Sequence, residues 1–93
     1  MSIPYKPGAT QVVAYTGTAG TISNATGAGI QVIRVVLTTA GHIAITPAGT
    51  AATTSDIYMP AGIPEYFVVP ASVKVSAIQV ASGGNLHVTE MSR

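Results

Sequence analysis

The sequence predicts an all-β fold: a single antiparallel β-sandwich of about eight strands, jelly-roll-like, with an extended N-terminal arm. The chain has 11 Val, 9 Ile and 12 Thr but two Leu, and β-branched side chains favour pleated sheets. Short β-competent runs separated by Gly, Pro, Asn or Ser recur at roughly eight to twelve residues, a spacing typical of small sandwiches. No segment has convincing helical periodicity.

The β-competent runs can be placed along the chain one by one. They predict strands at residues 10–16, 19–23, 30–38, 42–46, 55–59, 65–69, 73–81 and 85–91. Residues 30–37 are apolar on both faces apart from Gln31 and Arg34, which indicates a strand that is covered on both sides. Arg34 must then reach a sheet edge, a carboxylate or water.

The two ends of the chain differ in their turn chemistry. Pro4, Pro7 and Gly8 disfavour regular structure, so residues 1–8 are expected to form an extended arm and residues 9–93 a single domain. Near the other end, Gly83 and Gly84 suit a two-residue hairpin turn that would join the last two strands. A jump in the apolar alternation before this turn predicts a bulge near Ser76 and Ala77.

Charge is scarce. The chain carries four bases and three acids among 93 residues, and its 8% of charged residues compares with about 25% in soluble domains. A short chain without cysteine often needs oligomerisation for stability. We therefore expect a homo-oligomer whose weakly charged surfaces are covered by other subunits.

The same composition disfavours several partners. The four bases are scattered and form no basic patch, so nucleic-acid binding is not expected. No apolar run approaches 18 residues, and two prolines interrupt the start where a signal peptide would be continuous, so neither a membrane span nor export is expected. We expect the chain to be made in the cytoplasm.

Chemistry-bearing side chains are few. The side-chain carboxylates and imidazoles are His42, Asp56, Glu65, His87 and Glu90. His87 and Glu90 lie three apart on one predicted strand and therefore point to opposite faces. We expect no catalytic, cofactor-binding or metal-binding residue, and therefore not an enzyme. The glycine-rich segments open no helix and carry no phosphate-binding lysine, so they are interpreted as turns.

The second half of the chain resembles small structural proteins of tailed bacteriophages. Residues 59–71 read MPAGIPEYFVVPA, residues 73–78 read VKVSAI and residues 83–90 read GGNLHVTE. The shared pattern is a Pro-Ala-Gly turn, a strand ending in Val-Pro-Ala, an apolar strand, and a Gly-Gly turn leading to a closing Val-Thr-Glu. This resemblance covers about a third of the chain, and residues 1–50 match only in composition.

The resemblance implies a capsid decoration, or cement, protein. Such a protein is a compact β-sandwich that oligomerises, commonly as a trimer, and bridges major capsid protein subunits on the virion surface. It has no catalytic residues and no cofactor. Multivalent contact with the shell would turn weak individual interfaces into a strong clamp.

Candidate contact residues come from the arm, from the small and uncharged loop at residues 47–55, and from exposed positions on strands. An extended, nearly uncharged segment can add strand-like hydrogen bonds to a neighbour. The candidates are Ile3, Tyr5, Lys6, Arg34, Pro47, Thr50, Tyr58 and Tyr66.

Two other functions fit the same sequence. A phage tail, fibre or adaptor component would use similar strands. A small carbohydrate-binding sandwich would need exposed aromatic rings, and Tyr58 with Tyr66 is the pair that could form such a platform. Core or interface packing is the alternative use of these tyrosines.

Overall fold

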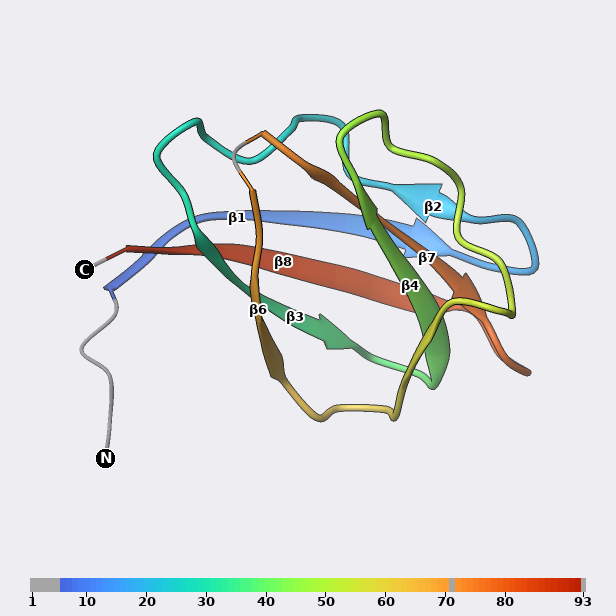
Figure 1. Ribbon diagram of the computed structural model, residues 1–93. Coiled ribbons are helices and arrows are strands. Elements are labelled where there is room, and N and C mark those ends of the chain that lie inside the picture. Colours follow the sequence, from blue (N-terminus) through green and yellow to red (C-terminus); the bar gives the residue numbers. More distant parts are fainter. Residues whose placement is uncertain (1–5, 71, 93) are drawn as a thin grey trace.

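The computed structural model describes residues 6–70 and 72–92, which form eight β-strands and no helix (Figure 1). The strands are β1 (Lys6–Tyr15), β2 (Gly20–Thr21), β3 (Val32–Leu37), β4 (Gly41–Thr46), β5 (Ile57–Met59), β6 (Glu65–Val68), β7 (Lys74–Gln79) and β8 (Gly84–Ser92). The predicted all-β class is confirmed, and each predicted strand overlaps one observed strand. In this part of the chain no helix could cross a membrane.

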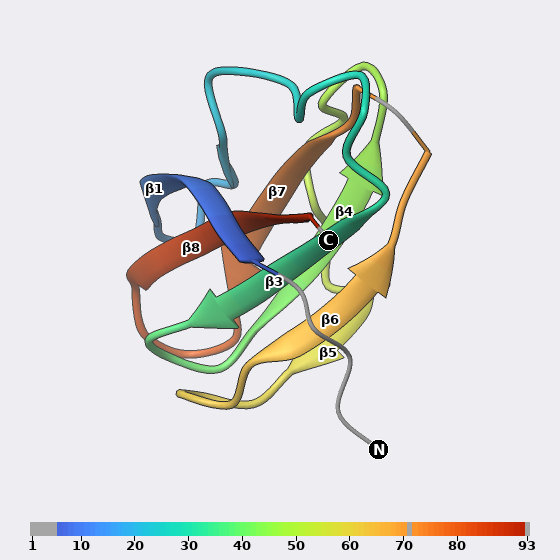
Figure 2. The ribbon, with the colours of Figure 1, turned by 90° about the vertical axis from the view of Figure 1, so that its left-hand side faces the viewer.

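The strands form two antiparallel sheets of four. Sheet A has the order β1-β8-β3-β6, and sheet B has the order β2-β7-β4-β5. The chain changes sheet at every connection except the one between β4 and β5. Figure 2 shows β8, β3 and β6 following one another across sheet A. The first and last described strands are therefore neighbours.

One hydrophobic core joins the two sheets. On β3 the side chains of Ile33, Val35 and Leu37 are fully buried and share this core with residues of β4, β5 and β7 from the other sheet. Burying a side chain of this size stabilises the fold by about 1.5–3 kcal/mol. The period-two alternation of the sequence therefore selects the face of each strand that turns inward.

The start of β1 differs from the predicted arm. Residues 1–5 of that arm lie outside the described residues, while residues 6–8 already belong to β1, where Lys6 pairs with Ser92 and Pro7 with Met91. Proline is tolerated here because β1 is an edge strand that pairs with β8 alone. The register then shifts between Pro7 and Thr10, which accommodates Gly8 in an irregular stretch of the strand.

The predicted hairpin between the last two strands is wrong. β7 lies in sheet B and β8 in sheet A, so the segment at residues 80–83 crosses between sheets. Gly84 is required for close packing: a Cβ there would lie 2.5 Å from Thr39 Oγ1 and 2.6 Å from Thr38 Oγ1. Neither Gly83 nor Gly84 has a positive φ. Glycine is needed at residue 84 because a side chain does not fit there, and not because a two-residue hairpin turn requires a positive φ.

The bulge predicted in β7 is also wrong. The register of β7 against β4 runs without a shift from Gly41 opposite Gln79 to Thr46 opposite Lys74. Val75 and Ala77 face the core, while Ser76 lies on the opposite face and is nevertheless 0% exposed. The apolar alternation along β7 is irregular because residues on its outer face, such as Ser76, are buried as well as those that face the core.

Candidate functional site

The outer face of sheet B is partly covered by the chain itself. The segment between β4 and β5 folds back over it and places Ala52, 3% exposed, against the sheet. The Ala52 N–H donates to Ser76 Oγ at 3.0 Å, and the Thr21 hydroxyl donates to the same oxygen at 3.0 Å. Ser76 therefore fastens both this segment and the short strand β2 to β7.

Local hydrogen bonds shape this segment, which carries the predicted contact residues Pro47 and Thr50. The Thr50 N–H donates to Thr46 Oγ1 at 2.8 Å. Gly49 has a φ of 73°, a left-handed conformation that L side chains rarely adopt. The side chains of Pro47 and Thr50 remain exposed, so both can contact another molecule from an ordered turn.

On the outer face of sheet A, large apolar side chains are exposed on both edge strands. Val12 on β1 is 56% exposed, and on β6 Tyr66 is 57% and Val68 is 85% exposed. The middle of the face is closed, because Val32 and Met91, which pair in register, are both 8% exposed. A group of large exposed apolar side chains on one sheet face is typical of an interaction surface.

Arg34 lies near the centre of this face, half-buried. It pairs in register with Thr89 of β8 and with Tyr66 of β6. Thr89 is held on its other side by Thr10, whose hydroxyl lies 3.0 Å from that of Thr89. No ion pair joins charged side chains within residues 6–70 and 72–92. β3 is an inner strand of sheet A, so Arg34 is not at a sheet edge, and no carboxylate of the described residues pairs with it. Its partial exposure leaves the third expectation, contact with water.

The titratable groups lie apart. His42 on β4 contacts the Tyr58 ring edge-on, with ring centroids 5.6 Å apart, and its Nδ1 is buried without a hydrogen-bond partner. His87 is on the outer face of sheet A, in register with Val12 and Val36. Among the described residues no three His, Asp or Glu side chains gather as metal ligands would.

Two of the three side-chain carboxylates accept hydrogen bonds within the described chain. Asp56 Oδ2 accepts from the Thr53 N–H at 2.8 Å and from the Thr53 hydroxyl at 3.2 Å. Glu90 Oε2 accepts from the Gly27 N–H at 2.9 Å. These two carboxylates therefore fix turns and loops of the fold.

The other predicted contact residues are scattered. Ile3 and Tyr5 lie outside the described residues, and Lys6 is the exposed first residue of β1. Tyr58 is on β5 beside His42 of sheet B, whereas Tyr66 is on β6 in sheet A. The neighbours of the two tyrosines in sequence, Met59 and Phe67, both pack into the core. The rings therefore lie on opposite outer faces and do not form one aromatic platform.

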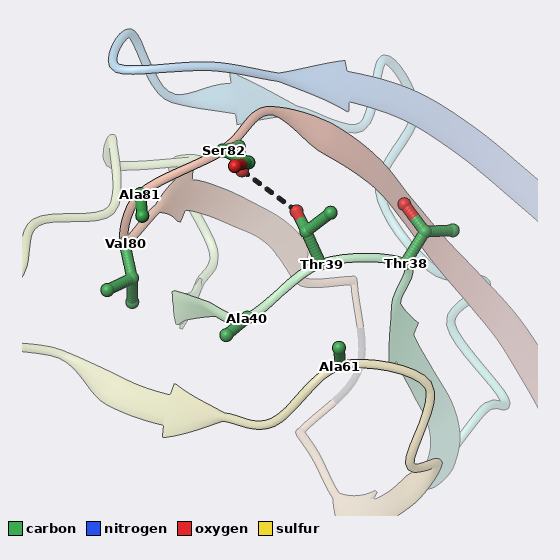
Figure 3. A pocket seen from close by; sticks show the side chains of 7 residues that line it. All are labelled: Thr38, Thr39, Ala40, Ala61, Val80, Ala81 and Ser82. Carbon is green, nitrogen blue, oxygen red and sulfur yellow. Dashed lines mark hydrogen bonds between the residues drawn. The ribbon is translucent and has the colours of Figure 1, made fainter.

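The structure also has a hollow that the sequence did not reveal. It has a volume of about 250 Å³ and lies at one end of the two sheets, where three connections meet (Figure 3). Its lining residues are small and uncharged: Thr38, Thr39, Ala40, Ala61, Val80, Ala81 and Ser82. The Thr39 hydroxyl donates to the Ser82 carbonyl at 2.9 Å and holds one wall (Figure 3). No local sequence pattern predicts it, because its walls come from three connections far apart in sequence.

Several surface residues that now stand out were missed as contact candidates, above all Val12 and Val68. Their exposure depends on which strands are edges, which sequence alone does not give. Comparison with family models, with curated proteins and with solved structures found no match to this chain. What defines its class is therefore the architecture itself: an all-β domain of two antiparallel sheets, with the outer face of sheet B partly covered by the chain and exposed apolar side chains on both edge strands of sheet A.

Proposed function

We propose that this chain is a capsid decoration, or cement, protein. It is a non-enzymatic virion structural protein that oligomerises, as a trimer, and bridges major capsid protein subunits on the capsid surface. The observation that carries the proposal is the open outer face of sheet A, with Val12, Tyr66 and Val68 each more than half exposed. Such a surface suits a protein that functions only when covered by neighbours.

The strand pairing supports a jelly-roll sandwich as the finer description of the fold. β1 pairs with β8, β2 with β7, β3 with β6 and β4 with β5. Nested pairs of this kind result when one long antiparallel hairpin rolls up into two sheets. Viral capsid domains are a common use of that architecture, as are lectin domains. The strand order therefore favours a virion component and, as the second class, a carbohydrate-binding module.

The carbohydrate-binding alternative has weaker support. Stacking on a sugar usually uses more than one aromatic ring, and Tyr58 and Tyr66 lie on opposite sheets. Glycan-array binding that is abolished by Tyr66→Ala would favour this alternative over the decoration protein.

The proposed mechanism is multivalent clamping. Each subunit of the oligomer presents the same neutral surfaces, including the exposed turn at Pro47 and Thr50 and the uncharged hollow lined by Ala40, Ala61 and Val80. Several weak contacts made at once by a linked set of subunits give an avidity far above that of a single contact. The shell is then held together at the junctions that the oligomer spans.

The proposal is tested on particles of the phage whose genome encodes the chain. Shells assembled with and without the protein are compared for loss of DNA on heating and after osmotic shock. We expect the depleted shells to release DNA at a lower temperature and purified protein to restore the complete-shell value. Equal tolerance of the two kinds of shell contradicts the stabilising role.

Location provides a second test. Particle reconstruction or labelling should place the protein on the head at many copies per particle. Finding it in the tail or in a fibre instead contradicts decoration and supports the tail, fibre or adaptor alternative.

A further inference from the structure

Arg34 and Glu65 lie on neighbouring strands but point to opposite sides of sheet A. In the register of β3 and β6, Arg34 is opposite Tyr66, and Glu65 is opposite Val35. Val35 is a fully buried core residue, and paired residues project to the same side of a sheet whereas successive residues alternate. Arg34 thus projects on the outer face and Glu65 on the inner side, so the two cannot form an ion pair in one copy.

Glu65 differs from the other carboxylates. Asp56 and Glu90 accept hydrogen bonds from Thr53 and Gly27, whereas Glu65 accepts none from the described residues. It begins β6, the edge strand of sheet A, and is half-buried there. A carboxylate at an unpaired sheet edge is accessible to a neighbouring molecule.

Arg34 has the complementary property. It is half-buried between Thr89 of β8 and Tyr66 of β6, with Val32 and Val36 before and after it on the same face of β3. If another protein covers this face, the guanidinium loses water, and an unpaired buried charge costs several kcal/mol. The covering molecule must therefore bring a carboxylate with apolar groups beside it.

We propose that the outer face of sheet A binds the β6 edge of a second copy of this chain, with Arg34 of one copy opposite Glu65 of the next. The β6 edge carries the matching group, the half-buried carboxylate of Glu65, with the exposed apolar side chain of Ile63 two residues before it. This inference rests on the oligomerisation in the proposed function and assigns a surface to it.

The charges also determine the symmetry. A two-fold contact of this face with itself would bring Arg34 toward Arg34, because both copies use the same patch. A contact between the face of one copy and the edge of the next brings opposite charges together. Head-to-tail contacts of this kind form a ring when the rotation between copies closes and a filament when it does not. A trimer is the smallest such ring.

The test is the oligomeric state of charge-reversed variants. Sedimentation equilibrium and light scattering compare the wild type with Arg34→Glu, Glu65→Arg and the double variant, from micromolar concentration upward, with circular dichroism to verify folding. Like charges at an interface cost several kcal/mol, so each single reversal should raise the dissociation constant about 100-fold or more. The double reversal restores the opposite charges and should return the constant to within about tenfold of the wild type.

Two matched controls separate this interface from general surface effects. Lys74→Glu makes the same charge change as Arg34→Glu but on β7 of sheet B, and it should leave the oligomer intact. Val68→Ser removes an apolar side chain from the proposed interface, whereas Val80→Ser removes one from the crossover between the sheets, where it is 51% exposed. The first should weaken association about tenfold, and the second should not.

The outcomes are distinct. A wild type that stays monomeric, single reversals that stay oligomeric, or a double variant that stays dissociated each overturns the interface. If the protein stabilises shells but its oligomeric state does not change in these variants, the proposed function is supported and this interface is contradicted. If the double reversal restores the oligomer but the protein never binds shells, the proposed interface is supported and the proposed function is contradicted.

Discussion

The two outer faces of this small domain both consist of short antiparallel strands, but they differ in how much of each face the rest of the chain covers. On sheet B, the segment between β4 and β5 lies against the sheet and leaves Ala52 at 3% and Ser76 at 0% exposure. On sheet A, Val12, Tyr66 and Val68 stay more than half exposed. The chain thus covers part of the outer face of sheet B, where Tyr58 on the edge strand β5 is still 55% exposed, and leaves apolar side chains exposed on both edge strands of sheet A.

The difference shows how a chain with so few charges can be organised. Sheet B is covered through hydroxyl and backbone hydrogen bonds, with Ser76 as the shared acceptor. On the outer face of sheet A, Arg34 lies between Thr89 and Tyr66 and has no ion pair with a described residue. Hydrogen bonds between neutral groups hold the covering segment on sheet B, whereas the proposed contact with another molecule on sheet A includes the charged side chain of Arg34.

The largest expected effect comes from breaking the cover of sheet B. Ala52→Asp buries a charge that has no partner and should lower the free energy of unfolding by about 3 kcal/mol or more. Ala51→Asp changes the neighbouring, exposed residue in the same way and should change it by less than about 0.5 kcal/mol. Chemical denaturation measures both. Equal losses of stability in the two variants would mean that the segment between β4 and β5 does not pack against sheet B, which contradicts the difference between the two outer faces.

A smaller loss is expected at the acceptor beneath the cover. Ser76→Ala leaves the buried Ala52 N–H without its partner and should destabilise the domain by about 1–3 kcal/mol. Ser82→Ala, at an exposed position, is the control. Hydrogen exchange of the Ala52 amide provides a local measurement, since its protection should fall in the first variant alone. Unchanged protection would show that Ser76 does not hold the segment.

The turn that leads into β5 should contribute less still. Asp56→Ala removes the acceptor of two hydrogen bonds from Thr53 and should cost about 0.5–1.5 kcal/mol. Asp56→Asn keeps an acceptor oxygen and should recover part of that stability. Thermal unfolding followed by circular dichroism compares the three proteins. If Asp56→Asn is no more stable than Asp56→Ala, hydrogen bonding at this turn is not the cause.

The smallest effect on the isolated subunit is expected on sheet A. Val68 is 85% exposed, so Val68→Ser should change the stability of the dissociated chain by less than about 0.5 kcal/mol. The measurement is denaturation at a concentration below the dissociation constant. A loss of more than 1 kcal/mol, on the order of a core contribution, would place Val68 in the intramolecular packing and contradict an open face.

Sequence reasoning located the strands but not their partners. Alternating apolar residues such as Ile33, Val35 and Leu37 carry a local signal, and punctuating Gly and Pro residues carry another. Pairing depends on contacts far apart in sequence, so Gly83 and Gly84 suggested a hairpin where the chain changes sheet. The need for glycine at residue 84 arises from Thr38 and Thr39, which no local pattern reveals.

The candidate surface was likewise only partly predictable. The place of Arg34 among apolar residues on a two-faced strand follows from alternation alone. The exposure of Val12 and Val68 does not, because it depends on β1 and β6 being the edges of sheet A. The burial of Ala52 has no periodic signal, since an uncharged and aperiodic segment covers a sheet as readily as it forms a free loop.

The pairing of β8 with both β1 and β3 has a consequence for biosynthesis. β8 is the last described strand to be made, yet it fills the middle of sheet A. Until it emerges from the ribosome, β1 and β3 have unpaired edges, and such edges promote aggregation. Folding that waits for contacts between distant strands is slow. A chain that lacks β8 therefore exposes strand edges that the finished sheet A covers.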